Sequence, residues 1–167
     1  MRSSFSTPAE AVAALQGQAT ELLAGRQRVR ALEAGAGKRT RLGLPEDAYI
    51  VGVDTDAAAL AHNEQLSERV LCDLAAYAPA EGTFDVVTSW YVLEHVDDPR
   101  VILDLFARWV APGGLIAIAV PNLISPKALI TKFTPHKFHI WFRWRVLGFP
   151  NAGKLGYGPY PPRCDGR

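Results

Sequence analysis

An apolar segment that ends in a glycine turn constrains this chain more than any other feature. It runs over residues 29–37 and predicts a short strand, about 28–34, followed by a tight bend. Gly35 and Gly37 lack a Cβ, so the backbone there can turn sharply and let a ligand lie against it. Glu33 precedes the first glycine by two residues. An ordinary strand-to-loop turn is the alternative interpretation of this segment alone.

Two further apolar runs also end in an acid. Asp54 follows residues 49–53, and Asp73 follows residues 69–72. Ligands of open α/β sheets bind at the carboxyl ends of the parallel strands. Three acids at that edge, Glu33 included, predict one nucleoside-sized ligand that lies across neighbouring strands.

Helical patterns alternate with these strands. A capping box at Thr7–Glu10, with Pro8 at the first helical position, predicts a helix to about residue 24. Further helices are predicted over residues 57–66 and 98–110. Between residues 38 and 47, a glycine and a proline predict a loop or a single turn in place of the usual helix.

Two more strands complete the pattern. They are predicted over residues 84–89 and 115–120, with a turn at Pro112–Gly114 before the second. The second strand is apolar throughout, as expected of a parallel strand that is covered on both faces. Alternating strands and helices predict an α/β fold, a doubly wound and mainly parallel sheet with helices on both sides.

Composition narrows the function classes. The chain has 167 residues, 49% of them hydrophobic and 21% charged, which is typical of a globular domain. A formal net charge of +1 gives no reason to expect nucleic-acid binding, and two cysteines give neither a disulfide framework nor recognisable zinc spacing. No apolar run approaches the roughly 18 residues of a spanning helix, and residues 1–5 lack the apolar core of a signal peptide, so we expect a cytoplasmic protein without a metal site.

Five tracts follow one another in order: Glu33–Gly37, Val51–Asp54, Cys72–Leu74, Phe84–Val87 and Ala111–Leu115. Together they resemble the class I S-adenosylmethionine-dependent methyltransferases, over residues 28–122. Leu93–Pro99 is similar to the signature after the fourth strand in their small-molecule branch, the methyltransferase type 11-like proteins. The resemblance implies a Rossmann-like sheet of order 3-2-1-4-5, S-adenosylmethionine as cofactor, and methylation of a small molecule.

The resemblance also implies roles for individual residues. Glu33 would hold the methionine end of the cofactor, Asp54 both ribose hydroxyls, and Asp73 the adenine amino group. A carboxylate suits hydroxyls because it has two accepting oxygens; turn formation is the alternative role for both aspartates. Ser89 and Trp90 would flank the sulfonium. The predicted cofactor-binding residues are Glu33, Ala34, Gly35, Gly37, Asp54, Thr55, Asp73, Leu74, Ser89 and Trp90.

No catalytic base is identified. His95 and His136 are candidates, although in the family signature the residue at position 95 more often shapes the cofactor pocket. A methyl group on a sulfonium is already activated, so alignment of the reactants is the main requirement. A base would help a hydroxyl or amine nucleophile.

The chain departs from the family after the fifth strand. Relatives continue with a helix and a strand pair, and no such pair follows Val120. Residues 115–120 would therefore form an open, apolar edge, a liability for pairing and aggregation. An apparently shortened chain suggests an alternative, an inactive remnant that acts through assembly, such as a homodimer. A dinucleotide-dependent oxidoreductase using NAD is disfavoured because Thr40 replaces the third glycine of its fingerprint.

The domains follow from these boundaries. An N-terminal helix (1–27) precedes the S-adenosylmethionine-binding core (28–122), and a helical lid or substrate segment (123–150) and an irregular tail (151–167) follow it. Basic and aromatic residues interleave over 133–147. A lid is the favoured interpretation; peripheral membrane contact through this stretch is the alternative.

Overall fold

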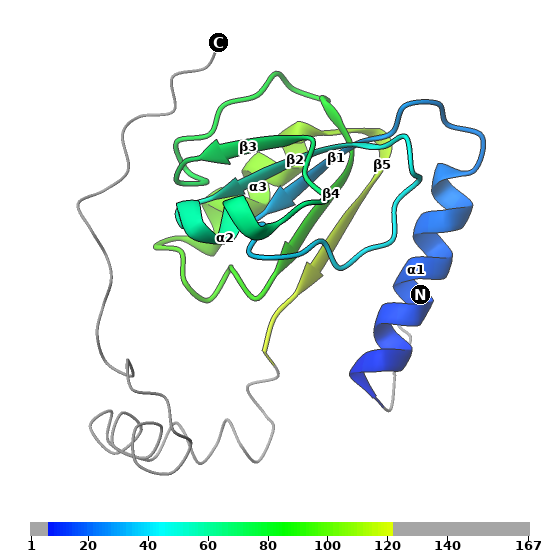
Figure 1. Cartoon of the computed structure of the whole chain (residues 1–167), viewed down its shortest axis with the longest axis horizontal. Helices are drawn as coiled ribbons and strands as arrows, with labels where there is room; N and C mark the ends of the chain where they lie inside the picture. The colour runs from blue at the N-terminus through cyan, green and yellow to red at the C-terminus, as the bar shows by residue number, and fades with distance from the viewer. Residues whose placement is uncertain (1–6, 122–167) are drawn as a thin grey trace. The chain divides into compact units, whose positions relative to one another are not determined.

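The computed structural model describes residues 7–121, and they form a parallel α/β sheet (Figure 1). The five strands lie in the order β3-β2-β1-β4-β5, and every neighbouring pair is parallel. The strands are β1 (Arg30–Ala34), β2 (Tyr49–Asp54), β3 (Glu68–Leu71), β4 (Phe84–Trp90) and β5 (Val110–Ala119). The helices are α1 (Pro8–Leu23), α2 (Ala57–His62) and α3 (Pro99–Trp109). The predicted fold class and strand order are confirmed.

Helices cover both faces of this sheet. Side chains that alternate along a strand point to opposite faces; Ala31 of β1 therefore packs with residues of α1 and α2, while Leu32 packs with α3. Figure 1 shows α2 in front of the sheet and α3 behind it. No helix among residues 7–121 is both long and apolar enough to cross a membrane.

The first helix begins at the predicted capping box. The Thr7 hydroxyl accepts a hydrogen bond from the Glu10 amide (3.2 Å), and the Glu10 carboxylate accepts one from the Thr7 amide (3.3 Å). Gln16 joins α1 to the loop after β1: its Nε2 donates to the Gly43 carbonyl, and its Oε1 accepts from the Gly43 amide, both at 2.7 Å. That loop contains no helix, as the glycine and proline predict.

The second helix is shorter than predicted, because it ends at His62 instead of residue 66. The carbonyls at a helix C-terminus need donors from outside the helix. Arg69 supplies them: its Nε donates to the Leu60 carbonyl (2.9 Å) and its Nη2 to the Asn63 carbonyl (2.7 Å). The side-chain Nδ2 of Asn63 also donates to the Ala36 carbonyl across 3.4 Å, so the helix end is fixed against the loop after β1.

The fifth strand differs from its prediction in two respects. Residues 112–114 are not a separate turn, because β5 already begins at Val110 and its pairing with β4 is irregular between Phe84 and Val86. The strand is also not covered on both faces by residues 7–121, since Ile116 and Ile118 keep 36% and 37% of their surface exposed. The predicted lid, tail and absent strand pair concern residues outside the described part of the chain.

Candidate functional site

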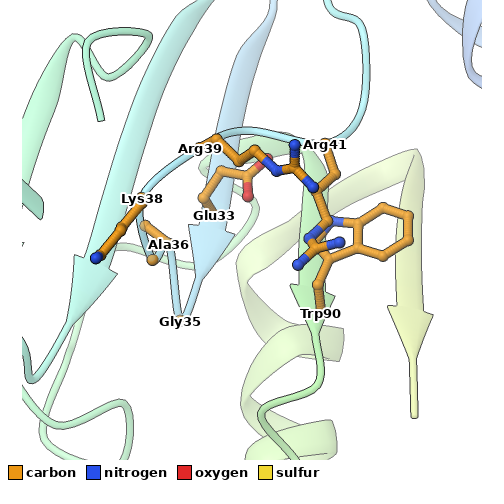
Figure 2. A pocket seen from close by; sticks show the side chains of 8 residues that line it. Glu33, Gly35, Ala36, Lys38, Arg39, Arg41 and Trp90 are labelled. Atoms are coloured by element: carbon orange, nitrogen blue, oxygen red, sulfur yellow. The ribbon is translucent and has the colours of Figure 1, made fainter. Parts of the chain in front are cut away.

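A pocket of about 300 Å³ opens at the carboxyl ends of β1 and β4 (Figure 2). Its lining residues are Glu33, Gly35, Ala36, Gly37, Lys38, Arg39, Arg41 and Trp90. Four of them, Glu33, Gly35, Gly37 and Trp90, are predicted cofactor residues. The loop residues Ala36, Lys38, Arg39 and Arg41 are not among the sequence predictions. The signal that could have identified the basic residues is their position directly after the glycine turn, in a segment predicted to be a loop. A loop there stays close to the strand end, whereas a helix would lead the chain away from it.

Glu33 is a buried acid beside the pocket, with 2% of its surface exposed. It lies opposite Thr88 in the pairing of β1 with β4. Burial raises the pKa of the Glu33 carboxyl from 4.5 to about 7, although a hydrogen bond with Thr88 and the charge of Arg41 both lower it. Its Oε1 has no hydrogen-bond partner among the described residues. A buried acid in this state favours a ligand that brings a donor or a positive charge.

The two glycines of the turn have different surroundings. Gly35 has a φ of +73°, and a Cβ there would lie 2.2 Å from Cγ2 of Val92, so a larger residue does not fit. Gly37 has a φ of +54°, but a Cβ there would meet nothing within 4 Å. Gly35 therefore serves the packing of the turn, while the space beside Gly37 is open to a ligand.

Asp54 connects the turn to the second strand. Its Oδ2 accepts a hydrogen bond from the Gly37 amide (2.8 Å), and its Oδ1 accepts one from the Asp56 amide (2.9 Å). The neighbouring Thr55 is exposed. Each carboxylate oxygen can accept two hydrogen bonds, so both Asp54 oxygens keep capacity for ligand hydroxyls. The turn-forming role and the ligand-binding role are therefore compatible.

Asp73 and Leu74 follow β3, the next strand along this edge. The Asp73 Oδ1 accepts from the Ala75 amide (2.8 Å), which is the local turn that its residue type favours. The Asp73 side chain is exposed. Leu74 is buried against the core on the α3 side of the sheet. Neither residue lines the pocket, but the Cys72 amide bonds to the Asp54 carbonyl (3.0 Å), which brings the ends of β2 and β3 together.

Ala34, Ser89 and Trp90 complete the predicted set at the ends of β1 and β4. Ala34 pairs with Ser89 in the sheet. Ser89 is buried, with 1% of its surface exposed, and its Oγ has no partner among the described residues. The buried Nε1 of Trp90 also has none. Buried polar atoms are normally hydrogen-bonded, so those of Glu33 and Trp90, which both line the pocket, favour a ligand there. Ser89 is not among the residues that line the pocket.

The histidine candidates gain no support from this geometry. His95 is exposed and is not among the residues that line the pocket. His136 lies outside the described residues. No group of three or more histidine, cysteine, aspartate or glutamate side chains in residues 7–121 is arranged to hold a metal ion.

Comparison with known proteins identifies a family for the chain. A family model described as a methyltransferase domain matches residues 9–155. The ubiquinone biosynthesis O-methyltransferase of Burkholderia ambifaria is 36% identical over 103 residues, which are 56% of this chain and 44% of that protein. The protein of the same name from Pseudomonas aeruginosa is 34% identical over 116 residues, 65% of this chain and 49% of that protein. The chain thus spans about half the length of the curated relatives it matches.

Solved structures share the fold. The plantazolicin methyltransferase BpumL, in complex with a triazolic desmethylPZN analog and SAH, has a TM-score of 0.59 at 15% identity, covering 78% of this chain and 54% of that one. A SAM-dependent methyltransferase from Thermotoga maritima has a TM-score of 0.53 at 23% identity, covering 73% of this chain and 57% of that one.

Proposed function

Because the chain belongs to the methyltransferase-domain family, with S-adenosylmethionine as its cofactor, we propose that it transfers the methyl group of S-adenosylmethionine to a small molecule. The observation that carries the proposal is the buried carboxyl of Glu33, whose Oε1 has no partner among the described residues, beside a glycine turn that Asp54 holds in place. We place the cofactor on the core formed by residues 28–122, and treat residues 1–27 and 123–167 as the segments that flank it.

The residues at the carboxyl edge suit the groups of this cofactor. The ammonium of its methionine end would supply the cation and donors that Glu33 Oε1 lacks. Its ribose hydroxyls would donate to Asp54, whose two oxygens keep accepting capacity. Asp73 and Leu74, at the end of β3, would hold the adenine. These three contacts lie in the order β1, β2 and β3, so they would orient one extended molecule across neighbouring strands.

The chain's own contribution to methyl transfer is then mainly orientation. When bound, S-adenosylmethionine supplies a methyl group on a positively charged sulfur, which becomes neutral on transfer. Trp90, on the pocket wall, would exclude water from one side of the sulfonium, and Ser89 would lie at the same strand end. No base among residues 7–121 is needed for an acceptor that ionises in solution. The names of the similar ubiquinone biosynthesis proteins support an oxygen atom as the nucleophile.

A non-catalytic remnant that acts through assembly is the second candidate. The observation that favours it is the apolar side of the edge strand β5, where Ile116 and Ile118 are 36% and 37% exposed; Val120, directly after the strand, is 56% exposed. Such an edge invites pairing with another chain. Homodimerisation there, and the membrane contact suggested for residues 133–147, would both be compatible with a remnant.

Calorimetric titration of the full chain with S-adenosylhomocysteine and with NAD separates the candidates. Binding of S-adenosylhomocysteine alone supports the methyltransferase. Binding of NAD alone would support an oxidoreductase, and binding of neither would support the remnant.

Asp54 provides a residue-level test of the same proposal. Replacing Asp54 with asparagine keeps one accepting oxygen, so the glycine turn can still be held, but removes the charge that strengthens hydrogen bonds from ribose hydroxyls. We expect affinity for S-adenosylhomocysteine to fall about 10- to 100-fold, since bonds to charged groups contribute about 1.5–3 kcal/mol. Asp104→Asn, on the exposed side of α3, is the matched control. Equal affinity in D54N and D104N would refute the ribose assignment.

A further inference from the structure

The pocket contains more positive charge than its own acid can balance. Lys38, Arg39 and Arg41 line it together with Glu33. The ion pair recorded among the described residues joins Arg26 to Asp85, and it involves none of these three cations. Glu33 itself is only partly ionised near neutral pH, because burial raises its pKa to about 7. A positively charged, concave surface attracts anions and raises their rate of association.

The proposed cofactor does not remove this excess. S-adenosylmethionine carries one carboxylate, one ammonium and one sulfonium, so it adds a net positive charge. Its carboxylate can neutralise one of the three cations, and its ammonium is assigned to Glu33. Two of the three cations, all of them exposed side chains, therefore remain available to a different, negatively charged ligand.

Arg41 is the cation best placed for that ligand. Figure 2 shows Arg41 on the same side of the pocket as Trp90 of β4, and Lys38 on the opposite side, towards β2. The Arg41 guanidinium carbon lies 5.6 Å from the ring centroid of Tyr91, the residue directly after β4. A cation over an aromatic face is held there by the ring quadrupole. Arg41 thus lies beside the strand end to which the sulfonium is assigned.

We propose that the methyl acceptor carries an anionic oxygen group, a carboxylate or a phosphate, and that Arg41 binds it. This inference rests on the proposed function. The planar guanidinium matches both groups with two parallel hydrogen bonds, which gives orientation as well as affinity. An acceptor held this way presents its nucleophilic atom in a fixed direction relative to the methyl group. Methyl transfer requires this alignment. Arg41 is a positioning residue in this scheme.

The test uses the full chain saturated with S-adenosylhomocysteine and three probes: protocatechuate, its primary amide, and phenyl phosphate. The acid and amide have nearly the same shape and differ in charge. We expect protocatechuate or phenyl phosphate to bind at least about tenfold more tightly than the amide, and added salt to reduce the difference. The stronger of the two anions identifies which group the pocket prefers. Affinities are measured by ligand-observed NMR titration.

Variants assign the preference to Arg41. Arg41→Gln should abolish it and Arg41→Lys should reduce it, because lysine keeps the charge without the planar fork. Arg100→Gln, an exposed arginine at the start of α3, should keep it. Affinity for S-adenosylhomocysteine should change less than about threefold in Arg100→Gln and in Arg41→Lys, which keeps the positive charge that lowers the pKa of Glu33.

Three results would overturn the inference alone: no anion bound more tightly than the amide, a preference that survives in R41Q, or a large loss of S-adenosylhomocysteine affinity in the charge-preserving R41K, which would assign the Arg41 guanidinium to the cofactor. Failure of the unaltered chain to bind S-adenosylhomocysteine would instead overturn the proposed function, and the inference with it.

Discussion

Replacing Glu33 with glutamine is expected to stabilise the ligand-free chain by about 3 kcal/mol at pH 8 and by much less at pH 5. The reason is the rise in the pKa of this carboxyl from 4.5 to about 7 on burial. One pKa unit corresponds to about 1.4 kcal/mol. The folded chain binds the proton more tightly than the unfolded chain, so ionisation of Glu33 lowers the free energy of unfolding. This destabilisation is absent below pH 4.5, grows as pH rises towards 7, and is constant above it.

Urea unfolding at the two pH values measures this difference. Glu64→Gln is the control, because Glu64 is exposed and should give the same small effect at both. An equal effect of E33Q at pH 5 and pH 8 would mean that Glu33 is not held with a raised pKa.

The same substitution should weaken cofactor binding. The ammonium of S-adenosylhomocysteine requires the ionised form of Glu33. With a pKa of about 7, the ionised fraction of this carboxyl rises about tenfold between pH 6 and pH 8. The affinity of the unaltered chain for S-adenosylhomocysteine should therefore rise by the same factor. E33Q should bind more weakly and with a flatter pH dependence. A residue that costs stability and supports binding is typical of a functional site. Unchanged affinity in E33Q would separate Glu33 from the cofactor.

Gly35 and Gly37 should respond differently to alanine. Gly35→Ala places a Cβ 2.2 Å from Cγ2 of Val92 at a φ of +73°, so we expect a loss of about 3 kcal/mol or more in the free energy of unfolding, and no detectable binding of S-adenosylhomocysteine. Gly37→Ala meets no atom within 4 Å and should cost only about 1–2 kcal/mol, the strain of a left-handed backbone. Denaturant unfolding and calorimetry measure the two quantities.

The pair of variants separates packing from ligand approach. G37A should fold yet bind more weakly, because its methyl group enters the space assigned to the ligand. The double variant G35A/V92A should recover part of the stability that G35A loses. Equal stability of G35A and G37A would contradict the packing role of Gly35.

Much of this arrangement could be predicted from sequence, because the strands are short apolar runs with local signals at their ends. The capping box at Thr7 and the N-caps Asp56 and Asp98 begin their helices where their residue types require. The end of α2 could not be predicted, because it depends on Arg69 of the following strand, which caps the carbonyls of Leu60 and Asn63 only once β3 has paired with β2. The early start of β5 depends likewise on pairing with β4: Val110 pairs with Phe84, and residues 111–114 form an irregularity before the pairing resumes at Leu115.

The lining of the pocket was predicted in part for the same reason. Acids at strand ends and glycines in a turn are local signals, so Glu33, Asp54 and Gly35 could be identified directly. The burial of Glu33 against Thr88 depends on strand pairing. The position of Arg41 over Tyr91 depends on how the loop after β1 folds back towards β4, and no residue pattern within that loop encodes it.

A crystal structure of the full chain with S-adenosylhomocysteine tests the central claim most directly. We predict the methionine ammonium at Glu33, the ribose hydroxyls at Asp54 and the adenine beside Asp73, along the carboxyl ends of β1, β2 and β3. S-adenosylhomocysteine bound elsewhere, with these three carboxylates free of contact to it, would contradict the account.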